Sequence, residues 1–405
     1  MHAAHLELRG FRNLLDAEVP LGAGVTTIHG PNGAGKTNLL EALYFGLAGR
    51  SFRASRDREV IRFGEEIARV SVELVNGPSE DSEGDPASAK PPSTAFMASI
   101  SRSSERRLLV DGNQLPGAEA SARRPPLAVF IPDRLGLIKG PPAARRAHLD
   151  RLVVALWPAR SEIRARYGRA LAQRNALLGR VRAGSASASA LDGWDQELAA
   201  QGVALRGVRN EAVGLLAEPF AKAAEALGLD GAATVRYLER GPIGEVQELA
   251  SALGERRDSD IRRGFTGSGP HADELAFELA GRALRRYGSQ GQQRVAVLSL
   301  LLAERDTLVG LGRPAPLTLL DDVMSELDVV RRRRLAERLQ GRGQVLITTT
   351  ESAAVPDVGG SWLGVRGGEI ETQEDYAAGS SDVLSASLRP DPPTTAVVSA
   401  PAAPS

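Results

Sequence analysis

Residues 30 to 37 read Gly-Pro-Asn-Gly-Ala-Gly-Lys-Thr, a glycine-rich stretch that ends in Lys and Thr. Its glycines allow successive backbone N–H groups to curl around a phosphate, the lysine reaches the outer phosphate oxygens, and the threonine hydroxyl binds magnesium. The β-branched run Gly24 to His29 precedes it, and an apolar stripe over Thr37 to Leu47 predicts that a helix follows. Because a helix N-terminus favours an anion, we predict a site for ATP and Mg²⁺ at this loop. The predicted ATP ligands are Gly30, Asn32, Gly33, Gly35, Lys36, Thr37 and Asn38, with Thr37 also on the metal.

The composition sets limits on the kind of protein. The 405 residues contain 50 Lys+Arg and 50 Asp+Glu, so any attraction to nucleic acid has to come from local patches. Cysteine is absent, which excludes disulfides and cysteine zinc sites and is typical of a cytoplasmic protein. No run of apolar residues is long enough to suggest a membrane span. We expect a soluble cytoplasmic protein with one large domain and an insertion, or with two domains.

A second acidic element follows the apolar run Leu317 to Leu320, which ends in Asp321 and Asp322. Asp321 is predicted to hold magnesium, and Asp322 to orient or deprotonate the attacking water. With Lys36 they form the predicted catalytic set. Taken alone, such a strand end is more often a turn or a helix cap, so its weight comes from the pairing with the loop.

Residues 287 to 294, Tyr-Gly-Ser-Gln-Gly-Gln-Gln-Arg, form a third element before the apolar helix Val295 to Ala303. Their position about 30 residues before the paired aspartates resembles the signature of ABC-type ATPases. In that class the turn contacts nucleotide that is held by the opposite protomer. The resemblance predicts ATP contacts across a homodimer interface from Ser289, Gly291 and Gln292. The alternative is a helix cap at Ser289 with solvated glutamines.

Two further segments fit the ABC-type scheme. Residues 325–328 correspond to the loop that contacts the other protomer, and residues 348–351 to the γ-phosphate sensor, which adds Thr349 to the predicted ATP ligands. Transporter subunits usually carry a histidine at the sensor. The threonines found here argue against a transporter subunit.

We divide the chain into four parts and expect an α/β fold, a P-loop NTPase of the ABC-type ATPase head class with an inserted α-helical arm. Further short strands are predicted over Ala4 to Phe11, Val70 to Val75, Ala95 to Ile100, Leu127 to Ile131 and Val345 to Thr349. The polar segment 77–92 is expected to be disordered. The predicted parts are 1–141 (N-terminal part of the head), 142–228 (arginine- and alanine-rich arm with a hairpin tip at 184–189), 229–372 (C-terminal part of the head) and 373–405 (disordered tail).

The arm carries an excess of arginine between Arg160 and Arg182, where Glu162 is the only acid. An excess of this kind can neutralise DNA phosphates and makes binding depend on salt. We predict DNA contacts from Arg160, Arg164, Arg169 and Arg174, although an arginine-rich helix face is often simply solvated. The segment shows no aromatic pattern for stacking on bases, so recognition of a duplex backbone is favoured.

The ordered set of motifs resembles the RecF family of bacterial recombination and gap-repair ATPases, from Met1 to about Gly368. It implies an SMC/Rad50-like head that forms a homodimer with ATP on double-stranded DNA near single-strand gaps, with weak DNA-dependent ATP hydrolysis. It also implies that RecR and RecO cooperate in loading RecA onto single strands coated by SSB. The residues that carry the resemblance are 30–38, 131–135, Lys139-Gly140, Arg145-Arg146, 269–275 (Gly-Pro-His-Ala-Asp-Glu-Leu), 289–294 and 319–328.

The chain departs from the family pattern at Ala272, where arginine is common, and it has no glutamine between Phe130 and Lys139. A glutamine-loop residue is therefore not assigned. Two alternatives stay open, the energising subunit of a transporter and a DNA clamp in which ATP turnover is irrelevant. A long-armed chromosome-organising ATPase is excluded by the arm length and the absent cysteine hook.

Overall fold

The computed structural model describes residues 1–54, 56–76, 92–131, 135–241, 244–356 and 359–372. The disorder predicted for the segment from residue 77 and for the tail from residue 373 lies outside the described residues, as do family-motif residues 132–134. Within the described ranges, no helix has both the length and the apolar character that crossing a membrane requires.

The central sheet of the head has the strand order β15-β14-β3-β13-β12-β8. All neighbouring strands run parallel except β15, which pairs antiparallel with β14. The strands are β3 (Val25–His29), β8 (Leu127–Phe130), β12 (Leu317–Leu320), β13 (Val345–Thr349), β14 (Gly360–Arg366) and β15 (Glu369–Glu371). The apolar runs predicted β3, β8, β12 and β13 to within one residue.

Both faces of this sheet are buried, as expected of a parallel sheet. Along β12 and β13, Leu319 and Leu346 point into the cluster that contains α1 (Lys36–Ala48). Their neighbours Leu320 and Ile347 point into the opposite cluster, which contains α10 (Gln290–Gly310). Successive strand residues alternate between the faces, so β12 is held firmly where its last residue leads into the paired aspartates.

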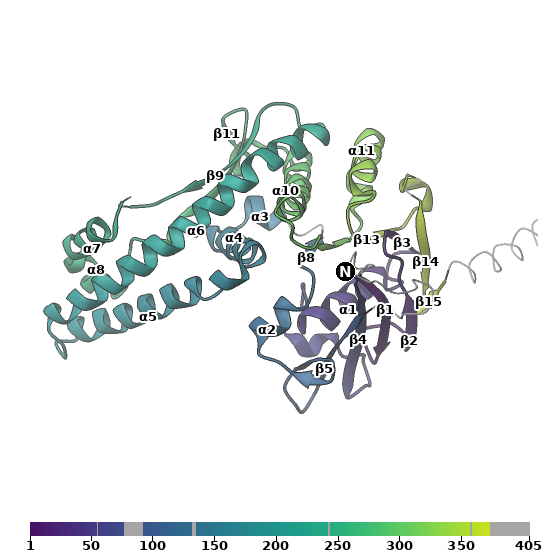
Figure 1. Ribbon diagram of the computed structural model, residues 1–405, viewed down its shortest axis with the longest axis horizontal. Helices are drawn as coiled ribbons and strands as arrows, with labels where there is room; N and C mark the ends of the chain where they lie inside the picture. Colours follow the sequence, from purple (N-terminus) through teal and green to yellow (C-terminus); the bar gives the residue numbers. More distant parts are fainter. Residues whose placement is uncertain (55, 77–91, 132–134, 242–243, 357–358, 373–405) are drawn as a thin grey trace, which may run out of the picture.

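A second, antiparallel sheet covers the other side of α1, in the order β2-β1-β4-β5-β6-β7 (Figure 1). The apolar face of α1, predicted from Leu39, Leu43 and Leu47, is completely buried against it. Strand β2 was not predicted. The strands are β1 (His2–Arg9), β2 (Ala17–Pro20), β4 (Ile67–Val75), β5 (Ser93–Ser101), β6 (Arg107–Val110) and β7 (Asn113–Gln114).

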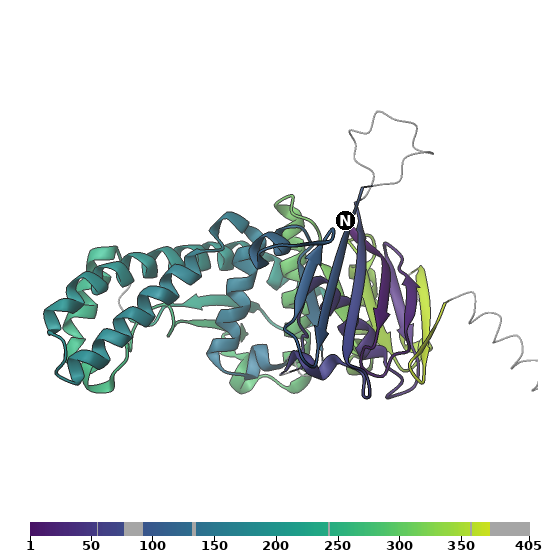
Figure 2. The same ribbon diagram turned by 90° about the horizontal axis from the view of Figure 1, so that it is seen from below.

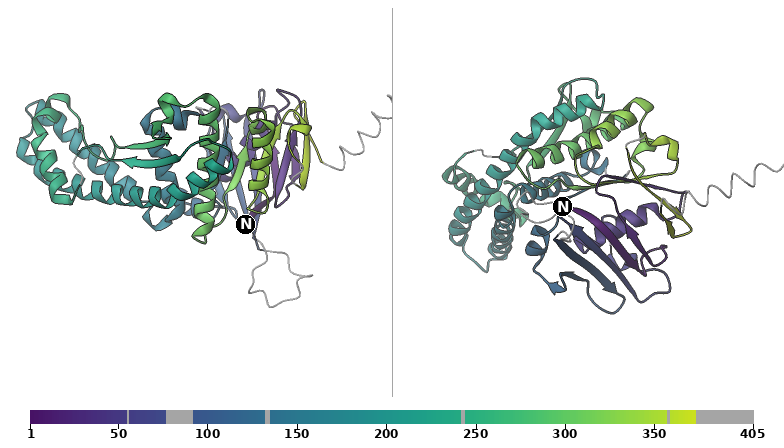
Figure 3. Two further views of the ribbon diagram at one scale, coloured as in Figure 1. Left: turned by 90° about the horizontal axis from the view of Figure 1, so that it is seen from above. Right: turned by 45° about the vertical axis from the view of Figure 1, so that its right-hand side comes forward.

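The arm projects from one side of the head as a pair of antiparallel helices (Figures 2 and 3). These are α5 (Ile163–Arg182) and α6 (Leu191–Ala226), and the turn between them lies where the hairpin tip was predicted. Helix α6 continues to the head and packs on α10. The head and the base of the arm also contain α2 (Gly117–Ala122), α3 (Gly136–Lys139), α4 (Pro142–Leu156), α9 (Leu284–Tyr287) and α11 (Val329–Leu339).

Segments that follow α6 in the sequence also lie on the arm. Helices α7 (Val246–Glu255) and α8 (Arg257–Arg263) pack on α6 and α5 near the tip, and β9 (Ala233–Leu238) packs along α6. Strand β9 pairs with β10 (Glu274–Leu279), which pairs with β11 (Arg282–Ala283). The domain boundary predicted at residue 228 therefore cuts through a packing unit.

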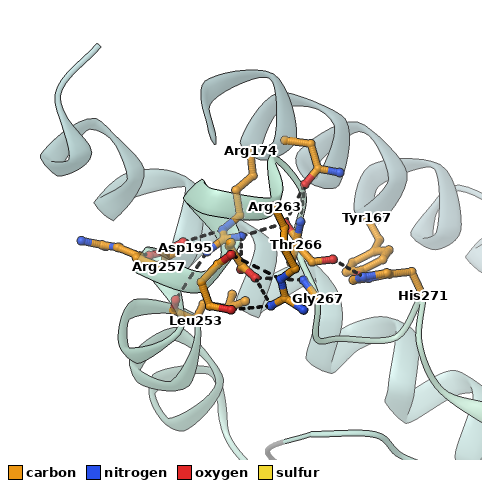
Figure 4. A network of polar contacts seen from close by, with 12 residues as sticks. Tyr167, Arg174, Asp195, Leu253, Arg257, Arg263, Thr266, Gly267 and His271 are labelled. Carbon is orange, nitrogen blue, oxygen red and sulfur yellow. Dashed lines mark hydrogen bonds and ion pairs between the residues drawn. The ribbon is translucent and has the colours of Figure 1, made fainter. Parts of the chain in front are cut away.

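A buried ion-pair network joins these tip elements around Arg174, whose side chain is 0% exposed (Figure 4). Its guanidinium donates to Asp195 on α6 at 2.7 Å, to Asp260 on α8 at 2.9 Å and to the hydroxyl of Thr266 at 2.7 Å. A guanidinium that is enclosed in this way cannot reach a DNA phosphate. The prediction that Arg174 contacts DNA is wrong.

Candidate functional site

The glycine-rich loop connects β3 to α1 and lies against β14. A Cβ atom at Gly30 would come within 2.1 Å of the carbonyl oxygen of Val365. Gly35, directly before the helix, has φ +122° and would bring a Cβ within 2.7 Å of Leu14. Only glycine fits at these two positions without a shift of the loop or of its neighbours.

The Lys36 side chain is buried inside the curve of the loop. Its Nζ donates to the carbonyl oxygens of Gly30 at 2.8 Å and Pro31 at 3.0 Å. Burial lowers the pKa of Lys36, and the charges of Asp322 and Asp321 act in the opposite direction. The loop therefore keeps an ammonium group at the place where a phosphate would be cradled.

A chain of hydrogen bonds joins this loop to the acidic end of β12. The hydroxyl of Thr37 donates to Asp321 Oδ1 at 2.8 Å. The hydroxyl of Thr348, near the end of β13, donates to the same oxygen at 2.7 Å. The Thr348 hydroxyl also accepts from the backbone N–H of Asp322 at 2.8 Å. Thr348 was not among the predicted ligands, yet it organises both aspartates.

Asp321 is buried, and burial raises its pKa, while the hydrogen bonds from Thr348 and Thr37 act against that rise. Its carboxylate and the Thr37 hydroxyl are oxygen ligands of the kind that Mg²⁺ prefers. The described residues contain no group of three or more His, Cys, Asp or Glu side chains that could hold a metal. The two oxygen ligands therefore fit an ion that takes its other ligands from phosphates and water.

Asp322 follows in a left-handed conformation with φ +46°, which is uncommon for a residue other than glycine. Within the described residues its buried Oδ1 has no hydrogen-bond partner. Buried carboxylate oxygens are normally paired, so this one can accept a hydrogen bond from a bound water.

Asn38 and Asn13 support the loop from the side. Asn38 donates to Asn13 Oδ1 at 2.5 Å, and Asn13 donates to the carbonyl oxygen of Gly33 at 3.1 Å. Arg53 in turn donates to Asn38. Asn38 was predicted as an ATP ligand, and the structure places it in a polar chain that leads away from the loop. Asn32 is exposed at the loop surface.

The signature segment caps α10 and faces outward. Ser289 accepts from the N–H of Gln292 at 3.2 Å, and the Gln292 side chain accepts from the N–H of Ser289 at 2.8 Å. Ser289 and Gly291 are exposed. The helix cap agrees with the alternative interpretation of this segment. The exposed Ser289 and Gly291 also agree with a signature that faces another protomer.

The segment 325–328 connects the paired aspartates to the signature helix. Ser325 donates to the carbonyl oxygen of Asp322 at 2.8 Å, and Glu326 forms an ion pair with Arg294 on α10. Asp328 caps α11. Thr349, the predicted sensor, is buried and its hydroxyl donates to the carbonyl oxygen of Glu351 at 2.9 Å.

The motif 269–275 ties the arm to the head. Asp273 is buried, pairs with Arg206 on α6 at 2.8 Å and accepts from the hydroxyl of Tyr237 at 2.7 Å. Glu274 forms a two-bonded ion pair with Arg145 on α4, at 2.7 and 2.9 Å. The two acidic residues of the motif thus form structural ion pairs, and Ala272, where the family commonly has arginine, directly precedes them.

The three other arginines that were predicted to contact DNA, Arg160, Arg164 and Arg169, have side chains that are at least partly exposed. Arg160 pairs with Glu211 at 2.5 Å and Arg164 with Asp150 at 3.0 Å. Arg169 is exposed on α5 and has no ion pair within the described residues. These three side chains can reach a ligand, whereas Arg174 cannot.

Comparisons with known proteins agree with this arrangement. The family model described as RecF/RecN/SMC N terminal domain matches residues 2–367. The chain is 36% identical to the DNA replication and repair protein RecF of Heliobacterium modesticaldum over 359 residues, which are 86% of this chain and 92% of the relative. It is also 36% identical to the protein of that name from Streptomyces avermitilis, over 88% of this chain and 96% of the relative.

Solved structures give the same result for the fold. A structure of the recombination mediator protein RecF with ATP has a TM-score of 0.78 at 27% identity, with 92% of this chain and 97% of that chain covered. An Smc head bound to the C-winged helix domain of ScpA has a TM-score of 0.56 at 17% identity and covers 93% of this chain, which shows a shared fold. The matching model, the relatives and the ATPase-head architecture agree, and the chain belongs to the RecF family.

Proposed function

We propose that this protein is an ATP-dependent DNA clamp of recombinational repair, in which two copies close over duplex DNA near a single-strand gap. The observation that supports this most is the hydrogen bond from Thr37 to Asp321, which joins residues 284 positions apart. It brings a phosphate-binding loop and a buried carboxylate together, and such a pair is what ATP with Mg²⁺ requires.

Each residue has a proposed role within one nucleotide site. Lys36 binds the outer phosphates, Thr37 and Asp321 hold Mg²⁺, and Asp322 orients the attacking water through its unpaired Oδ1. Mg²⁺, when bound, neutralises charge that develops on the transferred phosphoryl group. Because an aspartate is shorter than a glutamate, we expect ATP hydrolysis to be weak. The resemblance to the RecF family implies that hydrolysis also depends on DNA.

The second half of the site comes from the other copy in this proposal. Ser289, Gly291 and Gln292 meet the γ-phosphate across the interface, and Thr349 lies on the sensor strand. Support comes from the outward-facing cap of α10 and from the bonds that tie segment 325–328 to both Asp322 and Arg294. A change at the nucleotide can therefore reach the interface through a short set of contacts.

DNA and protein partners complete the proposal. Duplex phosphates are contacted by Arg160 and Arg164, and Arg169 extends this basic surface along the arm, so DNA binding weakens as salt rises. Since relatives carry the name DNA replication and repair protein RecF, and a solved relative is described as a mediator in the RecFOR pathway, we propose RecR and RecO as partners and RecA loading as the outcome. The protein would act in the cytoplasm.

Sedimentation of the protein with ATP and a gapped duplex tests the proposal. We expect a DNA-bound dimer for the wild type and none for Lys36→Met or Ser289→Arg. Asp322→Asn should keep the dimer and lose hydrolysis, since it changes the water site alone. A wild type that stays monomeric and off DNA with ATP bound would contradict the clamp mechanism.

A further inference from the structure

A groove on the arm lies outside the nucleotide site. It has a volume of about 540 Å³ and is lined by Arg166, Arg169 and Gln173 of α5 and by Trp194, Glu197 and Gln201 of α6. In each helix the lining residues are spaced i, i+3 and i+7, which places them on one face. The groove is therefore formed by two matched helix faces.

Several hydrogen-bond donors that line the groove have no partner among the described residues. Among the described residues, the Arg169 guanidinium, the Gln173 amide and the indole N–H of Trp194 form no hydrogen bond or ion pair. Arg166 is partly engaged, with Glu162 at 2.9 Å, and the only lining carboxylate, Glu197, accepts from Gln201 at 3.2 Å. An anionic ligand with a flat apolar part suits this combination of cations and a half-buried indole.

The two walls of the groove are held at a fixed distance. Arg174 directly follows Gln173, and Asp195 directly follows Trp194, and these two buried side chains are paired at 2.7 Å (Figure 4). Arg174 also binds Asp260 of α8, which anchors the pair from a third helix. A site with fixed walls loses little conformational entropy when it binds a ligand.

We propose that this groove binds one unpaired nucleotide of single-stranded DNA. The base stacks on Trp194, and Arg169 with Arg166 contacts the neighbouring phosphates. A duplex keeps its base faces covered, so the groove selects the unpaired strand. This inference rests on the proposed function, in which the arm lies near a gap, and it would let the arm recognise the single-stranded side.

Tryptophan fluorescence tests the contact directly. In a Trp157→Phe, Trp362→Phe background, Trp194 is the only tryptophan left of the three in the chain. An oligothymidylate of roughly eight nucleotides, within the usual size for single-strand sites, should quench it saturably without ATP. In the native background, Trp194→Ala should weaken oligonucleotide binding about tenfold, as measured by anisotropy, and Trp194→Phe should weaken it less.

Charge variants test the phosphate contact. Arg169→Ala should reduce the slope of log affinity against log salt by about 0.7. The matched control is Arg180→Ala, which removes an exposed arginine of α5 outside the groove and should leave affinity and slope near the wild-type values. Melting curves of all variants show whether they are folded.

Three results would overturn the inference: equal quenching by a closed hairpin duplex without unpaired bases, stronger quenching by a polyglutamate peptide, or unchanged binding by a folded Trp194→Ala. Formation of the ATP-dependent dimer on duplex is measured in parallel. If that dimer fails while the oligonucleotide still quenches Trp194, the proposed clamp is wrong and the groove assignment stands. If Trp194→Ala still forms the ATP-dependent dimer on duplex but no longer binds the oligonucleotide, both the proposed clamp and the groove assignment stand.

Discussion

At the scale of single residues, Asp321 faces two opposing requirements. As the proposed magnesium ligand, its carboxyl has to be ionised, yet burial raises the pKa of this carboxyl despite hydrogen bonds from Thr348 and Thr37. A carboxyl whose pKa is higher in the folded than in the unfolded state adds stability at low pH, and that contribution is lost as pH rises through the folded pKa. The nucleotide-free protein therefore has a cost at Asp321 near neutral pH.

Asp321→Asn should relieve that cost. We expect the nucleotide-free variant to be more stable than the wild type at pH 7 by about 1 kcal/mol, the usual size of such replacements, and to lose ATP hydrolysis. The difference should shrink as pH falls, because the wild-type carboxyl becomes neutral too. Thermal denaturation between acid and neutral pH measures this, and a variant that is less stable at every pH would contradict it.

Glu41 on α1 should show the opposite dependence. Burial would raise its pKa, but hydrogen bonds from Arg12, Arg53 and Ser51 outweigh burial and lower it. The stability it contributes is present above its unfolded pKa and is lost as pH falls through the folded pKa. Glu41→Gln should destabilise the protein at pH 7 by about 1–3 kcal/mol.

Urea denaturation at pH 7 and in acid measures the Glu41 effect, with the exposed Glu18→Gln as control. The loss should diminish in acid, where the wild-type carboxyl is also protonated. A loss of equal size at both pH values would show that packing, and not charge, explains the contribution of Glu41.

At the scale of elements, local pattern was enough for the core of the head. Short apolar runs predicted β3, β12 and β13, and glycine spacing with an apolar stripe predicted the loop and α1. It was not enough for the arm, where α7 and α8 fold back onto helices that come far earlier in the chain. Nothing in the local sequence shows that Arg174 pairs with Asp260, 86 positions away, or that Thr348 bridges both aspartates.

Arg174→Met tests the structural task of this side chain. Removing one partner of a buried ion pair commonly costs about 3–5 kcal/mol, because the other charge is left unpaired. Asp195 would keep only its pair with Arg257, and Asp260 only its pair with Arg263, so we expect a cost at the low end of this range and faster amide hydrogen exchange in α7 and α8. Arg169→Met, an exposed arginine of the same helix, should change stability by less than about 0.5 kcal/mol. Similar effects of the two changes on stability would contradict a structural role for the buried ion pairs of Arg174.

At the scale of the whole molecule, the proposed site is complete only when two copies meet. The Lys36 loop and the Ser289 cap lie on different elements, and the cap faces outward. Dimers of identical chains are usually two-fold symmetric, so each would contain two such sites. In a mixed dimer of a Lys36→Met chain and a Ser289→Arg chain, one site carries both defects and the other carries neither.

Mixing the two inactive variants should therefore restore hydrolysis. Because neither variant is expected to dimerise with itself, every dimer in an equal mixture is mixed and has one intact site, so we expect roughly half of the wild-type rate per chain if the sites act independently. DNA-stimulated phosphate release measures the rate, and each variant alone is the control. A mixture of Lys36→Met with Asp321→Asn, whose defects both lie on the loop side of the site, should stay inactive because neither site of the mixed dimer is intact. Recovery in that second mixture, or none in the first, would contradict a nucleotide site shared between two copies.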